Sequence, residues 1–162
     1  MITNIPTKKF SDPKVQILRR GAEYRALFLY HILKALKDHG YEFEMIGREG
    51  IFALGRSNSA GFPDTDIPEV FTDTLLEPPG ASSMQIERTV LSEKEAKLEF
   101  GYCPMCELWQ KVTDDQDMIA LLCDIAMEVD RGLVDTYPEF TLRLGKRISA
   151  GEAVCDFWIR KK

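Results

Sequence analysis

The chain has 162 residues and a mass of 18.5 kDa, which suits a single domain over residues 1–162 with a substantial core. Hydrophobic residues make up 44% and charged residues 29%, proportions typical of a folded soluble protein. The net charge of −5 argues against nucleic acid and membrane as partners, because such surfaces need clustered Lys and Arg.

The first eleven residues contain no apolar core of a signal peptide. The longest apolar run, Ala26 to Leu33, is interrupted by Tyr30 and His31 and is too short to cross a bilayer. We therefore expect a cytoplasmic protein with reduced thiols. Its four cysteines are then better interpreted as thiols or metal ligands than as a disulfide framework.

Helical signals dominate the first half of the chain. Ser11 and Pro13 are suitable starting residues for a long amphipathic helix that ends at Gly40. Apolar periodicity predicts a second helix over residues 41–56 and a short third one over residues 67–76.

The second half alternates between strand and helix signals. Residues 84–91 and 96–102 read as a hairpin, and a capping box opens a helix over residues 113–132. Two closing strands follow over residues 139–147 and 153–160. The predicted class is α+β: N-terminal helices packed on an antiparallel sheet of about four strands, with one further helix between two hairpins.

Cys103 and Cys106 form a Cys-Pro-Met-Cys sequence where the second strand runs out. Because Pro104 cannot donate to a sheet and restricts the residue before it, we interpret this sequence as a turn. Such a turn can hold a metal or form a redox pair, although a redox pair is more typical of a helix N-terminus.

The other two cysteines fall on regular elements. Cys123 lies on the flank of an apolar helical stripe, beside Asp130, whereas Asp124 points to the polar side. Cys155 shares the inward face of the last strand with Phe157. Each could equally be a small buried packing residue.

The spacing of the cysteines, with 2, 16 and 31 intervening residues, matches no common zinc or iron–sulfur pattern. We therefore expect no cofactor. A zinc or iron–sulfur site formed by all four is kept as an alternative: Cys103, Cys106, Cys123 and Cys155.

Several short motifs together resemble one known family, the bacterial L-2-amino-thiazoline-4-carboxylic acid hydrolases. The resemblance covers roughly the last sixty residues well and the N-terminal helices more loosely. It is carried by Cys103-Pro104, Trp109, Leu122-Cys123-Asp124-Ile125, Gly132, Gly151 and Cys155-Asp156-Phe157.

This resemblance implies hydrolysis of a cyclic C–N bond, with a thiazoline carboxylate opened by water to N-carbamoyl-L-cysteine. It also implies catalytic roles for the residues at the family's motif positions, Cys103, Cys123, Asp124 and Cys155. The chain departs from the pattern at two positions. Cys106 is an addition to the Cys-Pro turn, and Ala126 stands where a second acidic residue is expected.

The ring carbon of such a substrate, bonded to sulfur and two nitrogens, is an electrophile that a thiolate or a carboxylate-activated water can attack. The only histidines, His31 and His39, lie within and near the end of the first predicted helix, and we expect structural roles for them. An aspartate must then serve as the base: Asp124, Asp130 or Asp156.

Two residues are candidates for binding the substrate. Arg143, on a strand face opposite its apolar neighbours, could hold a carboxylate, although a solvated strand arginine is the alternative. Asp130 is the second candidate.

Three functions therefore compete: a hydrolase of a small cyclic amidine, a metal-binding sensor or electron carrier, and a ligand-binding regulatory module. The expected partner is a small-molecule substrate, and a homodimer is left open.

Overall fold

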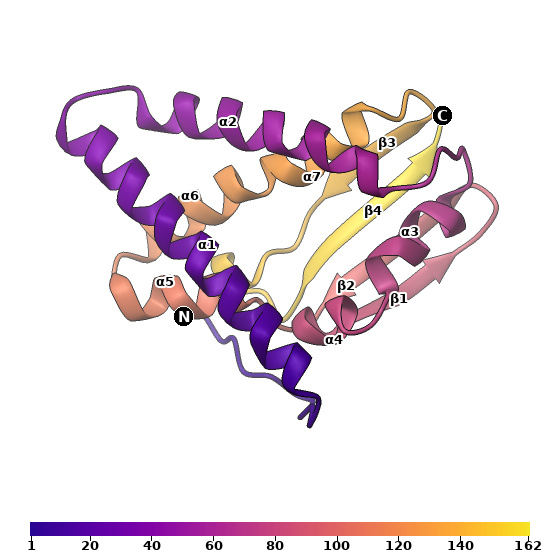
Figure 1. Ribbon diagram of the computed structural model, residues 1–162, viewed down its shortest axis with the longest axis horizontal. Coiled ribbons are helices and arrows are strands. Elements are labelled where there is room, and N and C mark those ends of the chain that lie inside the picture. The colour runs from indigo at the N-terminus through magenta and orange to yellow at the C-terminus, as the bar shows by residue number, and fades with distance from the viewer.

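The computed structural model describes residues 1–162 and begins with two long helices that meet in a V (Figure 1). Helix α1 (Pro13–Asp38) starts at Asp12, whose side chain accepts a hydrogen bond from the backbone N–H of Lys14. The N-cap therefore lies one residue after the predicted Ser11. The helix stops before Gly40, whose φ of 76° is the left-handed conformation expected of a residue that follows a helix. Helix α2 (Phe43–Asn58) follows.

A 3₁₀ turn, η1 (Ser59–Gly61), leads to helices α3 (Pro68–Leu76) and α4 (Gly80–Met84). The remaining elements are β1 (Ile86–Leu91), β2 (Glu95–Phe100), α5 (Pro104–Val112), α6 (Gln116–Ala126), α7 (Glu128–Asp135), β3 (Phe140–Leu144), η2 (Ile148–Ala150) and β4 (Cys155–Lys161).

The four strands form one antiparallel sheet in the order β1-β2-β4-β3. Strand β4 lies in the centre of this sheet beside β2, with Leu98 opposite Phe157 and Phe100 opposite Cys155. Helix α3 lies over β1 and β2, while α2 runs alongside α7 (Figure 1). The predicted α+β class, with N-terminal helices and two hairpins, is confirmed.

The segment between the hairpins holds three helices where one was predicted. The Cys-Pro-Met-Cys sequence is the first turn of α5, because Pro104 takes the first helical position, where its missing N–H costs nothing. The predicted helix over residues 113–132 is broken at Met127, where α6 ends and α7 begins. The carboxylate of Asp115 caps α6 by accepting from the backbone N–H of Met118.

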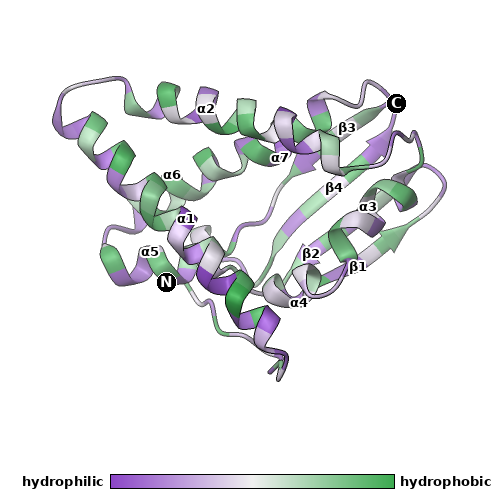
Figure 2. Ribbon diagram, in the orientation of Figure 1, coloured by the Kyte–Doolittle hydropathy of each residue, from purple (hydrophilic) through white to green (hydrophobic).

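Two hydrophobic clusters form the core. One lies beneath α1 and is built largely from α5 and α6, around Trp109 and Leu122. The indole N–H of Trp109 donates to the carbonyl oxygen of Ala26 on α1, so this buried polar group is satisfied. The other cluster joins the inner face of the sheet to α3 and α7, around Phe71 and Phe157. Figure 2 shows hydrophobic residues along α6, whose buried residues are Ile119, Leu122, Cys123 and Ile125.

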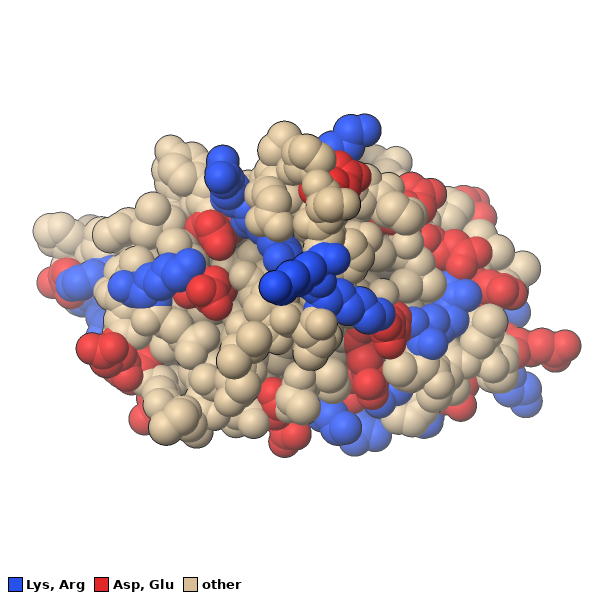
Figure 3. Space-filling view, turned by 90° about the horizontal axis from the view of Figure 1, so that it is seen from below, with Lys and Arg blue, Asp and Glu red and all other residues tan.

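The surface is charged but mixed. On the face in Figure 3, Lys and Arg are interspersed with Asp and Glu, and neither sign covers the whole face. None of the helices is both long enough and apolar enough to cross a membrane.

Candidate active site

A cavity of about 170 Å³ lies where α5, α6 and α7 meet one end of the sheet. Thirteen of its sixteen lining residues are hydrophobic, including Phe100, Trp109 and Phe157. The charged residues on its wall are Asp130, Lys146 and Asp156. Because most of the wall is apolar, these three groups determine how a polar ligand can be oriented.

Three of the four cysteines line this cavity: Cys103, Cys123 and Cys155. They come from the N-cap of α5, from α6 and from the first residue of β4. Cys106 is buried in the neighbouring core and does not reach the cavity. The three cysteines of the family resemblance are therefore brought together at the cavity, whereas Asp124 is not among its lining residues and the additional Cys106 lies in the adjoining core.

The thiols are strongly biased toward their protonated form. Burial raises the pKa of Cys103, Cys106 and Cys155 to about 12 each, and it also raises the pKa of Cys123. A thiolate is the reactive form of cysteine, so none of the four is activated as a nucleophile.

Two of these sulfurs accept hydrogen bonds from the backbone. The Sγ of Cys103 accepts from the N–H of Cys106 at 3.4 Å, which makes it the cap of α5. The Sγ of Cys155 accepts from the N–H of Ile148 at 3.3 Å. Cys103 does sit at a helix N-terminus, where a redox pair is expected, but burial outweighs the effect of the helix on its pKa. All four cysteines are free thiols.

No group of three or more His, Cys, Asp or Glu side chains is arranged to hold a metal ion. The four cysteines converge on one part of the core without forming a ligand set, so the geometry gives the metal-binding alternative no support.

Asp130 and Asp156 are the two acidic residues on the cavity wall, and the carboxyl group of Asp130 is the one without a partner. Asp130 lies on α7 next to the thiols, and its negative charge contributes to the raised pKa of Cys123 and Cys155. Burial raises the pKa of Asp130 itself to about 7, and the charge of Arg131 opposes this only in part. A carboxyl group with such a pKa can both accept and return a proton near neutrality.

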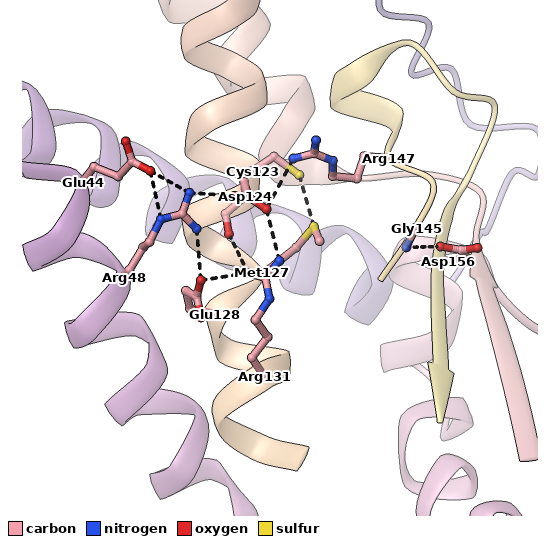
Figure 4. A network of polar contacts seen from close by, with 10 residues as sticks. All are labelled: Glu44, Arg48, Cys123, Asp124, Met127, Glu128, Arg131, Gly145, Arg147 and Asp156. Atoms are coloured by element: carbon pink, nitrogen blue, oxygen red, sulfur yellow. Dashed lines mark hydrogen bonds and ion pairs between the residues drawn. The ribbon is translucent and has the colours of Figure 1, made fainter. Parts of the chain in front are cut away.

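Asp124 is not among the residues that line the cavity, and three arginines hold its carboxylate (Figure 4). Its carboxylate lies 2.6 Å from the guanidinium of Arg48, 3.2 Å from that of Arg131 and 3.5 Å from that of Arg147. Although partial burial opposes the shift, these hydrogen bonds and charges hold the pKa of Asp124 below its usual range. The predicted catalytic role of Asp124 is not supported by this position, because its carboxylate is fully engaged outside the cavity.

Asp156 lines the cavity but is committed to the backbone. Its Oδ1 accepts from the N–H groups of Gly145 and Lys146, at 2.7 Å each. Its other oxygen lies 3.8 Å from the ammonium of Lys97. Of the three aspartates considered as bases, Asp130 is thus the one whose carboxylate is free to act on a ligand.

Arg143 is not brought to the cavity. It is exposed on the opposite face of the sheet, with its guanidinium 5.8 Å from the centre of the Trp158 ring. The cation at the cavity is Lys146, two residues beyond the end of β3, which the sequence interpretation missed. The strand alternation that places Arg143 outward was visible, but the course of the loop after β3 was not. His31 and His39 are both absent from the cavity wall.

The fold is that of a small α+β protein with a partly open, mostly apolar cavity, and an unpaired carboxyl group lies on the cavity wall. The chain belongs to the L-2-amino-thiazoline-4-carboxylic acid hydrolase family, whose model matches residues 19–159. This match spans α1 to β4 and so includes every residue of the cavity. Family membership suggests a hydrolase acting on a thiazoline substrate. No curated protein matches the chain.

Among solved structures, the chain is similar to a trafficking protein particle complex subunit 3 from Naegleria fowleri, which is covalently bound to palmitic acid. The sequences are 14% identical, the match covers 89% of this chain and 96% of the other, and the TM-score is 0.57. At this identity the likeness concerns the fold alone.

Proposed function

We propose that this protein hydrolyses a small cyclic amidine, with L-2-amino-thiazoline-4-carboxylate as the candidate substrate, and that Asp130 is its general base. The observation that carries the proposal is the unpaired carboxyl group of Asp130 on the wall of the cavity. The volume of about 170 Å³ also suits a single small ring, since pockets for drug-sized ligands enclose roughly 300–1,000 Å³.

Formation of N-carbamoyl-L-cysteine requires cleavage of the ring C–S bond, not of the cyclic C–N bond that the resemblance implies. Opening the ring to N-carbamoyl-L-cysteine forms a bond between the water oxygen and the ring carbon and breaks the ring C–S bond. Both C–N bonds at that carbon survive in the carbamoyl group. Of the two protons of water, one ends on the former ring nitrogen and the other on the released sulfur.

Asp130 fits this sequence of proton transfers. As a carboxylate it takes a proton from the attacking water, and as a carboxylic acid it returns the proton to the leaving sulfur. A pKa near the working pH favours both steps. The cysteines then form the wall of the cavity, because their pKa values keep them as thiols.

The test is a ring-opening assay that follows L-2-amino-thiazoline-4-carboxylate and N-carbamoyl-L-cysteine by chromatography. Asp130→Asn keeps the size of the side chain and removes the base, so we expect kcat to fall by about 100-fold or more. Asp135→Asn is the matched control on the same helix. Its carboxylate is exposed and pairs only with Arg56, so turnover should match the wild type.

Serine variants of the three lining cysteines, Cys103, Cys123 and Cys155, separate the two chemical routes. A water mechanism predicts that each variant retains most of its turnover, whereas a thiolate mechanism predicts that turnover disappears in one of them. Absence of turnover in the wild type would refute the substrate, and full activity of Asp130→Asn would refute the base.

A second candidate function rests on the apolar lining and its cysteines. The protein from Naegleria fowleri carries palmitic acid covalently, and a cavity of about 170 Å³ walled by thiols and hydrophobic side chains is chemically suited to a short acyl group. Intact-mass measurement of the purified protein distinguishes the two. A mass increase of one short acyl group, removed by hydroxylamine, would favour acyl binding over hydrolysis.

A further inference from the structure

Two Cys-Asp pairs, one on α6 and one on β4, hold the same short loop. The loop comprises residues 145–149, that is, the connection after β3 together with the first two residues of η2. From β4, Asp156 accepts hydrogen bonds from the first two backbone N–H groups of this loop. Its neighbour Cys155 accepts from the fourth, that of Ile148. Figure 4 shows Asp156 facing Gly145 across the start of the loop.

The pair on α6 holds the side chains of the same loop. The carboxylate of Asp124 lies 3.5 Å from the guanidinium of Arg147. The hydroxyl of Ser149 is buried without a hydrogen-bond partner of ordinary geometry, yet it lies close enough to Cys123 to oppose the rise in the pKa of that thiol. Residues 145–148 are thus each held by Asp156, Asp124 or Cys155, and Ser149 lies beside Cys123.

What the loop presents to the cavity is Lys146. Its backbone N–H is fixed by Asp156, while its side chain is exposed and supplies the one cationic group of the cavity lining. The ammonium of Lys146 forms no ion pair within the chain, unlike those of Lys97 and Lys161. An exposed ammonium beside an apolar cavity, with no internal partner, is available to an anionic group of a ligand.

We propose that Lys146 binds the carboxylate of the substrate and that the two Cys-Asp pairs are positioning residues for it. This inference rests on the proposed function and specifies its substrate class as a small ring that carries both an amidine and a carboxylate. The opposite charges of Lys146 and Asp130 on one cavity wall orient such a ligand. Its carboxylate is attracted to the ammonium and its amidine to the carboxyl group.

The test compares binding of two ligands that differ only in the carboxylate, 2-amino-thiazoline and L-2-amino-thiazoline-4-carboxylate, by titration calorimetry. The quantity of interest is the ratio of their Kd values. The wild type should favour the carboxylate by about fivefold, the size expected of a partly exposed charge pair. In Lys146→Met the ratio should approach one, while Lys94→Met, in the turn between β1 and β2, should keep the wild-type ratio.

The positioning role is measured by the same ratio in Asp156→Ala and Cys155→Val. A purely structural loss weakens both ligands equally and leaves the ratio unchanged, whereas a displaced Lys146 lowers it. Asp156→Asn retains one acceptor oxygen and should restore part of the preference.

The outcomes separate the two proposals. If Lys146→Met keeps the preference for the carboxylate, the inference is wrong even if turnover is observed. If Asp156→Ala and Cys155→Val both keep the wild-type ratio, the positioning role is wrong. If the wild type binds the carboxylate through Lys146 but releases no N-carbamoyl-L-cysteine, the hydrolase proposal fails and the carboxylate site stands.

Discussion

Gly132 of α7 packs so closely against α2 that a β-carbon at this position would lie 2.1 Å from the carbonyl oxygen of Phe52. The contact is reciprocal. A β-carbon at Gly55 of α2 would lie 2.2 Å from the carbonyl oxygen of Val129. Backbone atoms of one helix therefore occupy the space that a side chain would need on the other. This crossing sets the position of α7, which carries Asp130.

We expect Gly55→Ala and Gly132→Ala each to destabilise the protein strongly, by about 3 kcal/mol or more, because the two helix backbones must separate. Gly50→Ala, also in α2, is the matched control. A β-carbon at Gly50 would have no neighbouring atom within 4 Å, so the change should be neutral or stabilise the helix by up to about 1 kcal/mol. Urea unfolding measures all three, and equal effects at Gly50 and Gly132 would contradict the close contact.

The thiols provide a second prediction. With pKa values of about 12 for Cys103, Cys106 and Cys155, alkylation by iodoacetamide at pH 8 should be far slower in the folded protein than in urea. Intact-mass spectrometry should find four additions in the unfolded chain and few in the folded one over the same time. Rapid modification of one cysteine in the folded protein would instead reveal a thiolate and restore the nucleophilic mechanism.

Asp124 should matter for stability more than for chemistry. Asp124→Asn removes the charge shared by Arg48, Arg131 and Arg147. Because Arg48 and Arg131 keep their ion pairs with Glu128, we expect a loss of about 1–2 kcal/mol. Asp38→Asn, which breaks an exposed pair with Lys34, should change stability by less than about 0.5 kcal/mol. Thermal unfolding at pH 7 compares the two, and similar small shifts would mean that the arginines find other partners.

Local signals in the sequence were sufficient for the class of fold. The alternation of apolar residues in the two hairpins located all four strands, and Gly40 located the end of α1. The break at Met127 was not visible, because apolar periodicity continues across the point where α6 ends and α7 begins. From the sequence alone Pro104 indicates a turn, although proline is equally suited to the first position of a helix.

The sequence predicted some residues of the site and missed others. Helical spacing placed Asp130 beside Cys123, and the cavity contains both. Lys146 was missed because it lies in an irregular loop, whose course depends on hydrogen bonds to Asp156 and Cys155. No periodicity describes such a segment, so its contribution to the cavity follows only from the tertiary structure.

The pH dependence of the free energy of unfolding reports on the pKa of Asp130. An unfolded aspartate has a pKa of about 3.9, whereas burial raises the pKa of Asp130 in the folded protein to about 7. Between these values the folded state retains a proton that the unfolded state has released. The contribution of Asp130 to the free energy of unfolding is therefore complete below about pH 4 and decreases as the pH rises toward 7.

Asp130→Asn carries no titratable group and should remove this decrease. Urea unfolding of both proteins from pH 4 to pH 8 should show the wild type losing stability relative to the variant across the interval, with a constant difference above it. Asp124 does not interfere, because its lowered pKa leaves it ionised in both the folded and unfolded states above about pH 5. Parallel curves would show that Asp130 is ionised throughout, and it would then lack the pKa on which its role as a proton carrier depends.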